Sequence, residues 1–340
     1  MRRLLRRLGA SLFVIWAVVS LTFVVSNIVP GDPARLVAGA QARPADVAHI
    51  RQQLGLDRPA LSQYVLFWKR LVHVGPGEIA KGDAQHESCA VVLPLGESAV
   101  HVDFGSSFQL GRPVVDLVSE RLPRTFALAL AGLLLQLLFG VATGVLAAWR
   151  KGSRLDRLLV GTSLLGISAP TFLIALLLQY VLAYHLRWLP LDGFGKTLGQ
   201  HALCMVLPAL TLGIYGGAFY TRLVRDEMAV LLKQDWVRTA QAKGAAPAGI
   251  LLRHALRNAL LPLVTSAGLD FGALMGGAVV TEQVFRWPGL GQLSVTALFN
   301  RDGPIIVACV IVSAVAIVVS NLLVDLVYAR LDPRVRVPAA

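Results

Sequence analysis

Residues 126–148 read FALALAGLLLQLLFGVATGVLAA, a run of 23 residues that contains no charged side chain. The hydrocarbon core of a bilayer is about 30 Å thick, and an α-helix needs about 20 apolar residues to cross it. Every backbone N–H and C=O in hydrocarbon must be satisfied within the segment, and a helix does this. The stretch therefore predicts a transmembrane helix and, with it, an integral membrane protein.

Five further apolar stretches have a similar length, and they cover residues 8–29, 158–184, 202–220, 259–281 and 305–324. They contain Pro170, Pro208 and the single charge of Asp270. Over all 340 residues, 55% are hydrophobic and 15% charged, against about 25% charged in an average soluble domain. We expect an all-α integral membrane protein with six transmembrane helices. Residues 8–29 exceed the apolar core of a signal peptide, so we expect an uncleaved helix.

The basic residues orient these helices, because cytoplasmic loops carry an excess of Lys and Arg. With a cytoplasmic N-terminus, the inner segments hold 18 basic residues in 70, whereas the outer segments hold 14 in 136. The sequence thus predicts that both termini are cytoplasmic. The net charge of +12 then reflects the cytoplasmic face of a protein in a lipid bilayer, and no nucleic acid partner is expected.

The predicted helices divide the chain into four parts. Residues 1–29 form a short tail and the first helix, 30–125 a large extracytoplasmic segment, 126–327 a five-helix core and 328–340 a cytoplasmic tail. Within 30–125 we expect a polar helix over 44–54 and an amphipathic helix over 59–74, which either packs on the rim of the bundle, as we favour, or lies at the membrane interface. Residues 75–101, rich in Gly, Pro and small polar residues, predict a flexible insertion.

The inner loop 221–258 is too long for a simple connection. Asp235 suits a helix N-cap, Gly244 suits the position after a helix end, and Pro247 prevents continuation. These signals predict a short helix over about 236–243, outside the membrane, that is suited to dock in a groove of another protein. The other interpretation is a solvated connector, for which Trp236 and Val237 are poor choices.

The same loop carries a family resemblance. RTA at 238–240 with Gly244, followed by RHALRNALLP at 253–262, resembles the EAA loop of ABC-importer membrane subunits, and more narrowly that of the dipeptide/oligopeptide/nickel permease family. Further similar motifs are PGDPA at 30–34, LGLDRP at 54–59, DFGSSF at 103–108, ERLP at 120–123, GGAVVTE at 276–282, WPGLG at 287–291 and DPR at 332–334. Arg238 and Thr239 depart from the general EAA pattern, as does Ala259.

The resemblance implies a type I ABC importer permease of a bacterial inner membrane. Such a chain forms half of the pathway with a second homologous permease, and it works with two cytoplasmic ATPases and an extracytoplasmic peptide-binding protein. The residues implied to couple to an ATPase are Trp236, Arg238, Thr239, Ala240, Lys243 and Gly244. We expect no enzymatic activity, cofactor or metal in this chain, since ATP and Mg²⁺ belong to the ATPases. The tripeptide GKT at 195–197 lacks the preceding glycine of a P-loop.

Asp270 is a carboxylate predicted in mid-membrane, where charge is costly and faces the bundle interior or a water-filled cavity. Gly268, Gly272 and Gly276 form a ridge of small residues beside it that permits close helix contact. Two interpretations stay open. Asp270 either lines the pathway and meets the positive amino end of a peptide, or it is satisfied by a neighbouring helix at the contact between permeases.

The segment after the fifth helix is a candidate outer gate, formed by Glu282, Trp287, Pro288 and Gly289. The alternatives are a plain loop and, for Trp287, an anchor at the membrane interface. Within the family, nickel complexes or glutathione are alternative substrates to di- and oligopeptides. Outside it, an intramembrane enzyme or a channel ranks lower, because one intramembrane carboxylate supplies no catalytic pair and a channel has no use for the long inner loop.

Overall fold

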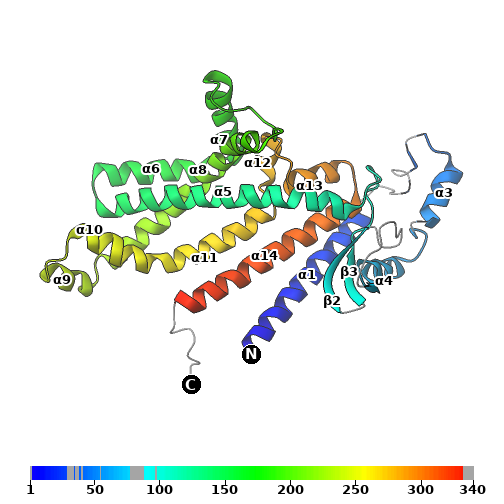
Figure 1. Cartoon of the computed structure of the whole chain (residues 1–340), viewed down its shortest axis with the longest axis horizontal. Helices are drawn as coiled ribbons and strands as arrows, with labels where there is room; N and C mark the ends of the chain where they lie inside the picture. Colours follow the sequence, from blue (N-terminus) through cyan, green and yellow to red (C-terminus); the bar gives the residue numbers. More distant parts are fainter. Residues whose placement is uncertain are drawn as a thin grey trace. The chain divides into compact units, whose positions relative to one another are not determined.

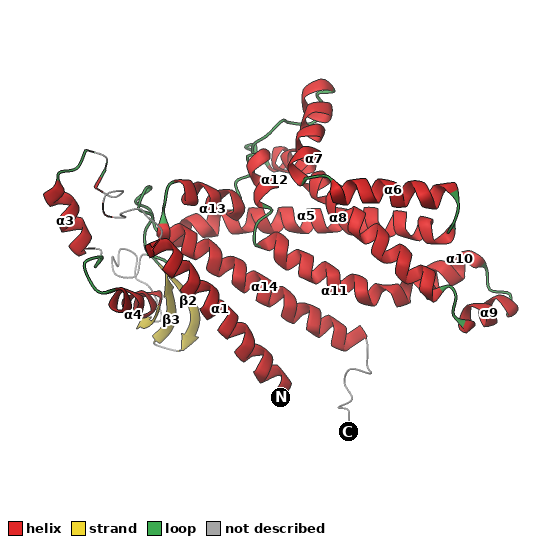
Figure 2. Ribbon diagram, turned by 180° about the vertical axis from the view of Figure 1, so that it is seen from behind, coloured by secondary structure: helices red, strands yellow, loops and turns green. Residues whose placement is uncertain are grey.

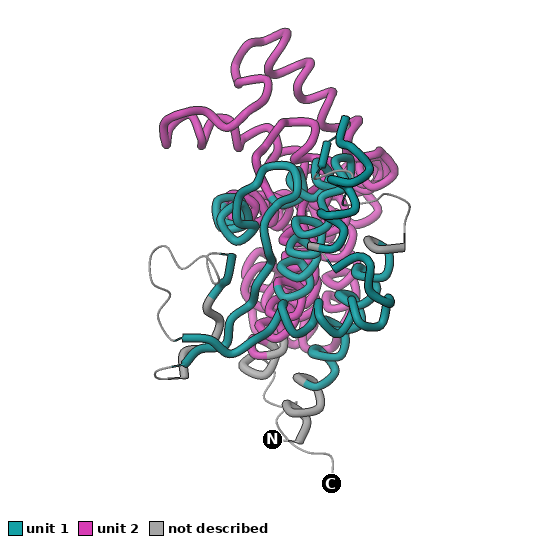
Figure 3. Tube along the Cα trace, turned by 90° about the vertical axis from the view of Figure 1, so that its right-hand side faces the viewer, with its two compact units in different colours: residues 1–123, 290–315 teal, residues 124–289, 316–340 magenta. Residues whose placement is uncertain are grey.

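The computed structural model describes residues 2–28, 34, 38–39, 41–53, 55–76, 88–95 and 98–331. They fall into two compact units, unit 1 with residues 1–123 and 290–315 and unit 2 with residues 124–289 and 316–340 (Figure 3). Several predicted features lie outside the described residues, namely most of the motif at 30–34, the middle of the expected insertion and everything after residue 331.

Four helical runs in the described chain are long and apolar enough to cross a membrane, namely α5 (Val114–Trp149), α8 (Leu198–Leu231), Pro247–Met275, and Gly303–Val324 of α14 (Gly303–Leu331). They contain the predicted stretches 126–148, 202–220 and 305–324, and most of 259–281. The run Pro247–Met275 consists of α10 (Pro247–Gly249), the π-helical turn η2 (Ile250–Ala255) and α11 (Leu256–Met275). The prediction of long apolar helices is confirmed for these four.

The predicted span 158–184 is instead a bent pair of helices. α6 (Arg154–Ser168) ends before α7 (Thr171–Leu178), which continues as η1 (Gln179–His185), and the two halves meet at 105°. Ala169 has an extended backbone with ψ 131°, because the ring of the following proline disfavours the helical conformation there. The prediction of a single helix interrupted only by Pro170 was therefore wrong. With this pair counted as one span, the described chain has five, and the predicted six are not reached.

α1 (Arg2–Ile28) has a shorter apolar stretch, Gly9–Val25. The predicted amphipathic helix is α4 (Ala60–Leu71), and it packs on α1. The hydroxyls of Tyr64 and Ser20 are 2.7 Å apart, and the rings of Phe23 and Phe67 lie 4.9 Å from each other. The polar helix before it is α3 (Pro44–Gln53), as predicted from residues 44–54.

Unit 1 contains a three-stranded antiparallel sheet, which corrects the all-α prediction and the flexible insertion expected over 75–101 (Figure 2). Its strands are β1 (Val72–Pro76), β2 (Cys89–Leu95) and β3 (Ser98–Asp103), in the order β1-β3-β2. Val74 pairs with Val100 and Val72 with Val102. These β-branched residues alternate along both strands, and this period of two favours a sheet over a loop.

A buried carboxylate supports the turn after this sheet. Asp302, 1% exposed, accepts hydrogen bonds from Ser107 Oγ at 2.5 Å and from the Gln109 amide at 3.2 Å. Beside it, the start of α5 packs on α13 (Leu290–Phe299) and on the start of α14 in one apolar cluster. Unit 1 thus has its own hydrophobic core.

Unit 2 is built on a close contact between α5 and α8, and α8 also packs on α6 (Figure 1). Glycines make the contact. A Cβ at Gly140 would collide with Tyr220, and one at Gly144 would lie 2.8 Å from Val224 Cβ. The hydroxyls of Thr143 and Thr221 are 2.7 Å apart across the same contact. Small residues let two helix backbones approach closely. This contact, the glycine seam, holds α5 and α8 together, and both helices line the candidate site.

Candidate functional site

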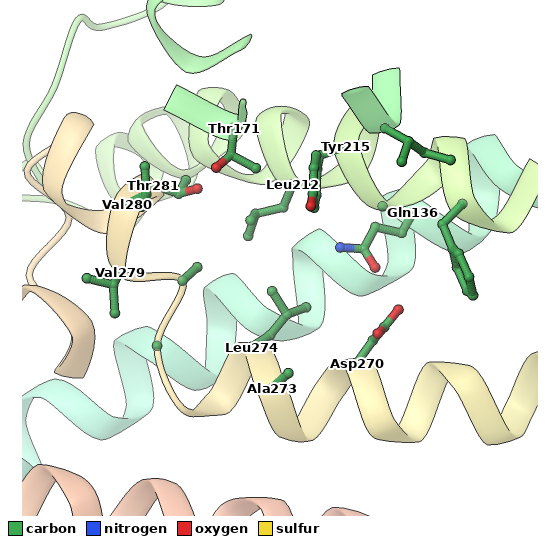
Figure 4. A pocket seen from close by; sticks show the side chains of 15 residues that line it. Gln136, Thr171, Leu212, Tyr215, Asp270, Ala273, Leu274, Val279, Val280 and Thr281 are labelled. Carbon is green, nitrogen blue, oxygen red and sulfur yellow. The ribbon is translucent and has the colours of Figure 1, made fainter. Parts of the chain in front are cut away.

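Unit 2 contains a partly open cavity of about 570 Å³ (Figure 4). Its wall comes from α5, α6, α7, α8, α11 and α12 (Val279–Val284), and it consists of Gln136, Ile167, Thr171, Leu212, Tyr215, Gly216, Phe219, Asp270, Ala273, Leu274, Gly277, Ala278, Val279, Val280 and Thr281. Most of these side chains are apolar, and a few polar groups point inward from different helices. This combination is typical of small-ligand sites, whose volumes are roughly 300–1,000 Å³.

Asp270 lies in this wall, on α11, and is partly buried. Tyr220 Oη on α8 donates a hydrogen bond of 2.6 Å to its Oδ2 atom. Within the part of the chain that the structure describes, no Lys, Arg or His forms an ion pair with the carboxylate. The two interpretations therefore stay open, since the group faces a cavity and also has a partner on a neighbouring helix of this chain.

Gln136 on α5 is a polar residue that the sequence reasoning missed. It is 4% exposed, and its Oε1 atom has no hydrogen-bond partner among the described residues. The close approach of Gly216 on α8 holds the side chain, because a Cβ there would collide with the carboxamide. Its position as a lone amide in the uncharged run 126–148 was the available signal, because polar groups within a span face the bundle interior.

The glycines near Asp270 lie against another helix of the same chain. A Cβ at Gly268 would collide with Val324, and one at Gly272 would lie 3.1 Å from Ser320 Cβ, both on α14. Gly276 is the C-cap of α11. Next to it, Gly277 has φ +104°, a conformation that ends the helix before the predicted limit of residue 281.

The candidate outer gate forms a tight turn between α12 and α13. Glu282 is fully buried and accepts a hydrogen bond from Thr125 Oγ1 at 3.0 Å, and a Cβ at Gly289 would collide with its carboxylate. Trp287, 2% exposed, donates from Nε1 to the Arg124 carbonyl at 3.1 Å. Because its ring is packed among apolar side chains of α5 and α8, Trp287 is not an exposed interfacial anchor in this structure. Pro288 separates it from Gly289 in the turn.

The short inner helix is α9 (Asp235–Ala242). Its C-terminal end is as predicted, because Gly244 has φ +78° and donates to the Gln241 carbonyl at 2.9 Å, while Ala245 donates to the Ala240 carbonyl at 3.0 Å. These two bonds form a Schellman motif. The N-cap prediction was wrong by one residue. Gln234 occupies that position without a capping bond, and its side chain accepts from Trp236 Nε1 at 2.6 Å.

The two faces of α9 differ. Val237 is buried, and Trp236 packs on the apolar cluster formed by residues of α5, α8, η2 and α11. On the opposite side the residues are exposed, namely Arg238, Thr239, Lys243 and Gly244, while Ala240 is half-buried. The helix is therefore fixed to its own chain on one side and open on the other.

A partly buried ion pair joins the extension of α8 to α6. Arg225 binds Asp156 through two contacts, Nε to Oδ1 at 2.8 Å and Nη2 to Oδ2 at 3.1 Å, and the Gly152 amide donates to the same carboxylate at 2.8 Å. A bidentate guanidinium–carboxylate pair holds both partners in one geometry. The α8 extension that leads to α9 is thus tied to the helix that carries Ile167 into the cavity wall.

The fold has a counterpart among solved ABC transporters. In the structures titled inward-facing conformations of the MetNI methionine ABC transporter, one chain matches 65% of this chain over 98% of its own length, with a TM-score of 0.55 and 17% identity. This likeness defines the class of the fold, that of the type I ABC importer permeases.

Sequence comparison gives the family. The binding-protein-dependent transport system inner membrane component matches residues 140–337, and the N-terminal part of such membrane components matches residues 1–129. A probable peptide ABC transporter permease protein of Sinorhizobium fredii is 38% identical, and the glutathione transport system permease proteins of Salmonella typhimurium and Escherichia coli K12 are 37% and 36% identical, each over 98% of both chains. The chain belongs to this family of inner membrane components, and the resemblance predicted from its motifs is confirmed.

Proposed function

We propose that this chain is a permease subunit of an ATP-driven importer for di- and oligopeptides, and that it forms half of the translocation pathway. The observation that carries the proposal is the full-length similarity to peptide and glutathione permeases. The nearly equal identities to the two kinds of relative also favour glutathione, itself a tripeptide, as a second candidate substrate. The chain itself supplies no catalysis.

The proposed architecture has six spans, with α1 and the bent α6–α7 pair among them, and both termini in the cytoplasm. The partners are a second homologous permease, two cytoplasmic ATPases that hold ATP and Mg²⁺, and an extracytoplasmic binding protein. α9 docks in an ATPase through its exposed face, around Arg238, Thr239 and Lys243. The fixation of its other face by Trp236 and Val237 supports a role in force transfer.

Purification from the native membrane tests this function. The tagged chain should retain an ATPase and a second permease, and the reconstituted complex should hydrolyse ATP faster when the peptide-loaded binding protein is added. Arg238→Glu, on the exposed face of α9, should lower this stimulation and leave membrane insertion intact. A chain that transports peptides alone and without ATP would refute the proposal.

A further inference from the structure

Two polar side chains from different helices line the cavity of unit 2. Asp270 and Gln136 project into it from α11 and α5 (Figure 4). Tyr220 occupies one oxygen of Asp270, and Gln136 Oε1 is buried without a partner within the described residues. Neither group is paired with a cation among those residues.

Each of these polar groups carries a free-energy cost when it lacks a partner. A buried carbonyl oxygen without a hydrogen bond retains the desolvation penalty of its burial. A carboxylate within a membrane-spanning helix is paired with a positive group or faces water. A ligand that brings positive charge and N–H donors would satisfy the free oxygen of the carboxylate.

The ligand chemistry follows from this pair. A primary ammonium group has one positive charge and three N–H donors. Anions are disfavoured, because no Lys, Arg or His of the described chain lines the cavity. A hard divalent cation takes six or more oxygen ligands, which one carboxylate and one amide do not supply. Apolar side chains such as Leu212, Phe219 and Leu274 complete the wall and suit the side chain beside an amino terminus.

We propose that the cavity binds the free amino terminus of a peptide, with the Asp270 carboxylate as the acceptor of its ammonium group and the Gln136 side chain beside it in the wall. The site rests on the importer function proposed above, and it places a recognition step in the permease, in addition to any selection by the binding protein. A peptide whose amino group is acylated loses the charge and two of the three donors, so the site discriminates against it.

A matched pair of probes tests the site in the complete transporter in lipid nanodiscs, without the binding protein. Alanyl-alanine amide carries the ammonium group, and N-acetyl-alanyl-alanine amide lacks it. Their affinities are measured by saturation-transfer NMR. We expect the wild type to bind the first about tenfold more tightly, as one charge-assisted contact implies. Asp270→Asn should abolish this preference, and Gln136→Leu should reduce it.

Two controls make the outcome decisive. Asp116→Asn removes an exposed carboxylate at the start of α5, and it should leave the preference unchanged. Asp270→Glu keeps the charge and should retain it, which separates loss of the site from loss of folding. Equal affinities for both probes in the wild type, or a preference that survives in Asp270→Asn, would overturn the inference.

The same purified transporter, reconstituted into sealed liposomes with the peptide-loaded binding protein, separates the two proposals. ATP hydrolysis and uptake stimulated by the peptide-loaded binding protein are measured for the wild type alongside the probe affinities. If both are normal while the probes are not distinguished, the ammonium site is wrong and the importer function stands. If the wild type shows neither stimulated hydrolysis nor uptake, both proposals fail.

Discussion

At the scale of single residues, Tyr220 links packing to the cavity. The residue is fully buried with its Cβ atom against Gly140, and its hydroxyl donates to the Asp270 carboxylate at 2.6 Å. The Cβ end of the side chain thus belongs to the glycine seam, and the hydroxyl contacts the polar wall of the cavity. Removal of the hydroxyl alone should therefore leave the seam intact and free the carboxylate to turn.

Tyr220→Phe is the substitution that makes this change. The lost hydrogen bond to a partly buried carboxylate should lower stability by about 1 kcal/mol, and the affinity for alanyl-alanine amide should fall less than in Asp270→Asn. Thermal unfolding and the NMR titration measure the two effects. Tyr184→Phe, on an exposed side chain outside the cavity, should change neither. An unchanged affinity and unfolding midpoint in Tyr220→Phe would leave Tyr220 with a packing role alone.

At the scale of elements, α9 depends on one backbone conformation. Gly244 has φ +78°, in the left-handed region that costs other residues roughly 1–2 kcal/mol. Its amide and that of Ala245 close the helix on two carbonyls. A side chain at residue 244 would strain this end and loosen the exposed face of α9.

Gly244→Ala should therefore destabilise the end of α9 by about 1 kcal/mol. We expect faster hydrogen exchange over α9 and weaker stimulation of the ATPase by the loaded binding protein, with the preference between the two peptide probes unchanged. Gly249→Ala is the matched control, because Gly249 has a helical φ of −65° and open space around it. Equal exchange and stimulation in the two variants would contradict a role for the Schellman motif.

An ionisable side chain, that of Asp103, supports the sheet of unit 1. Burial raises the pKa of the Asp103 carboxyl, but hydrogen bonds from Ser88, the Gly105 amide and Arg70 outweigh it and hold the pKa below its usual value. Arg70 lies 3.0 Å away and is 63% exposed, so solvent weakens its part. A depressed pKa means that the stabilisation is present above the ordinary pKa of 3.8 and is lost as the pH falls through the lower folded value.

Hydrogen exchange of the strand amides, corrected for intrinsic rates, should therefore increase in the wild type between pH 6 and pH 3. Asp103→Asn lacks the ionisable group, so its exchange should be faster at pH 6 and should depend less on pH. The difference at pH 6 should correspond to about 1 kcal/mol, the typical contribution of such hydrogen bonds. Parallel pH profiles in the two proteins would show that Asp103 does not support the sheet.

The elements differ in how far sequence predicted them, and the reasons are physical. Four long spans and the end of α9 follow from local rules, the length of apolar runs and the conformation that Gly244 adopts. The bend at Ala169 was equally local, because the restriction before Pro170 was sufficient to end α6. The sheet was missed because Gly and Pro between its strands masked the alternating valines. The cavity was not predictable, since Gln136 and Asp270 are 134 positions apart and only packing of α5 near α11 brings them together.

At the scale of the whole molecule, the basic residues and the described helices together predict the orientation of the chain in the membrane. The exposed Lys233 lies between α8 and α9, and the exposed Lys196 lies in the connection between η1 and α8. A single span, α8, separates the two positions, so they should lie on opposite sides of the membrane. The excess of basic residues near Lys233 predicts that this side is cytoplasmic.

Cysteine labelling checks this orientation. In a background without Cys89, Cys204 and Cys309, Lys196→Cys should react with an impermeant maleimide added outside intact spheroplasts. Lys233→Cys should react only in inside-out vesicles. The reverse pattern would invert the proposed topology, and labelling of both from one side would show that α8 does not span the membrane.

The glycine seam between α5 and α8 has a consequence for how this protein can change over generations. A lipid-facing leucine tolerates exchange for another apolar residue, because the hydrocarbon around it adapts to a new shape. A seam glycine such as Gly140 or Gly144 has a neighbouring helix at the distance of a missing methyl group, and even alanine forces the two helices apart. In a deep mutational scan, substitutions at the seam glycines should therefore be poorly tolerated, whereas apolar substitutions at the surrounding lipid-facing residues should be tolerated.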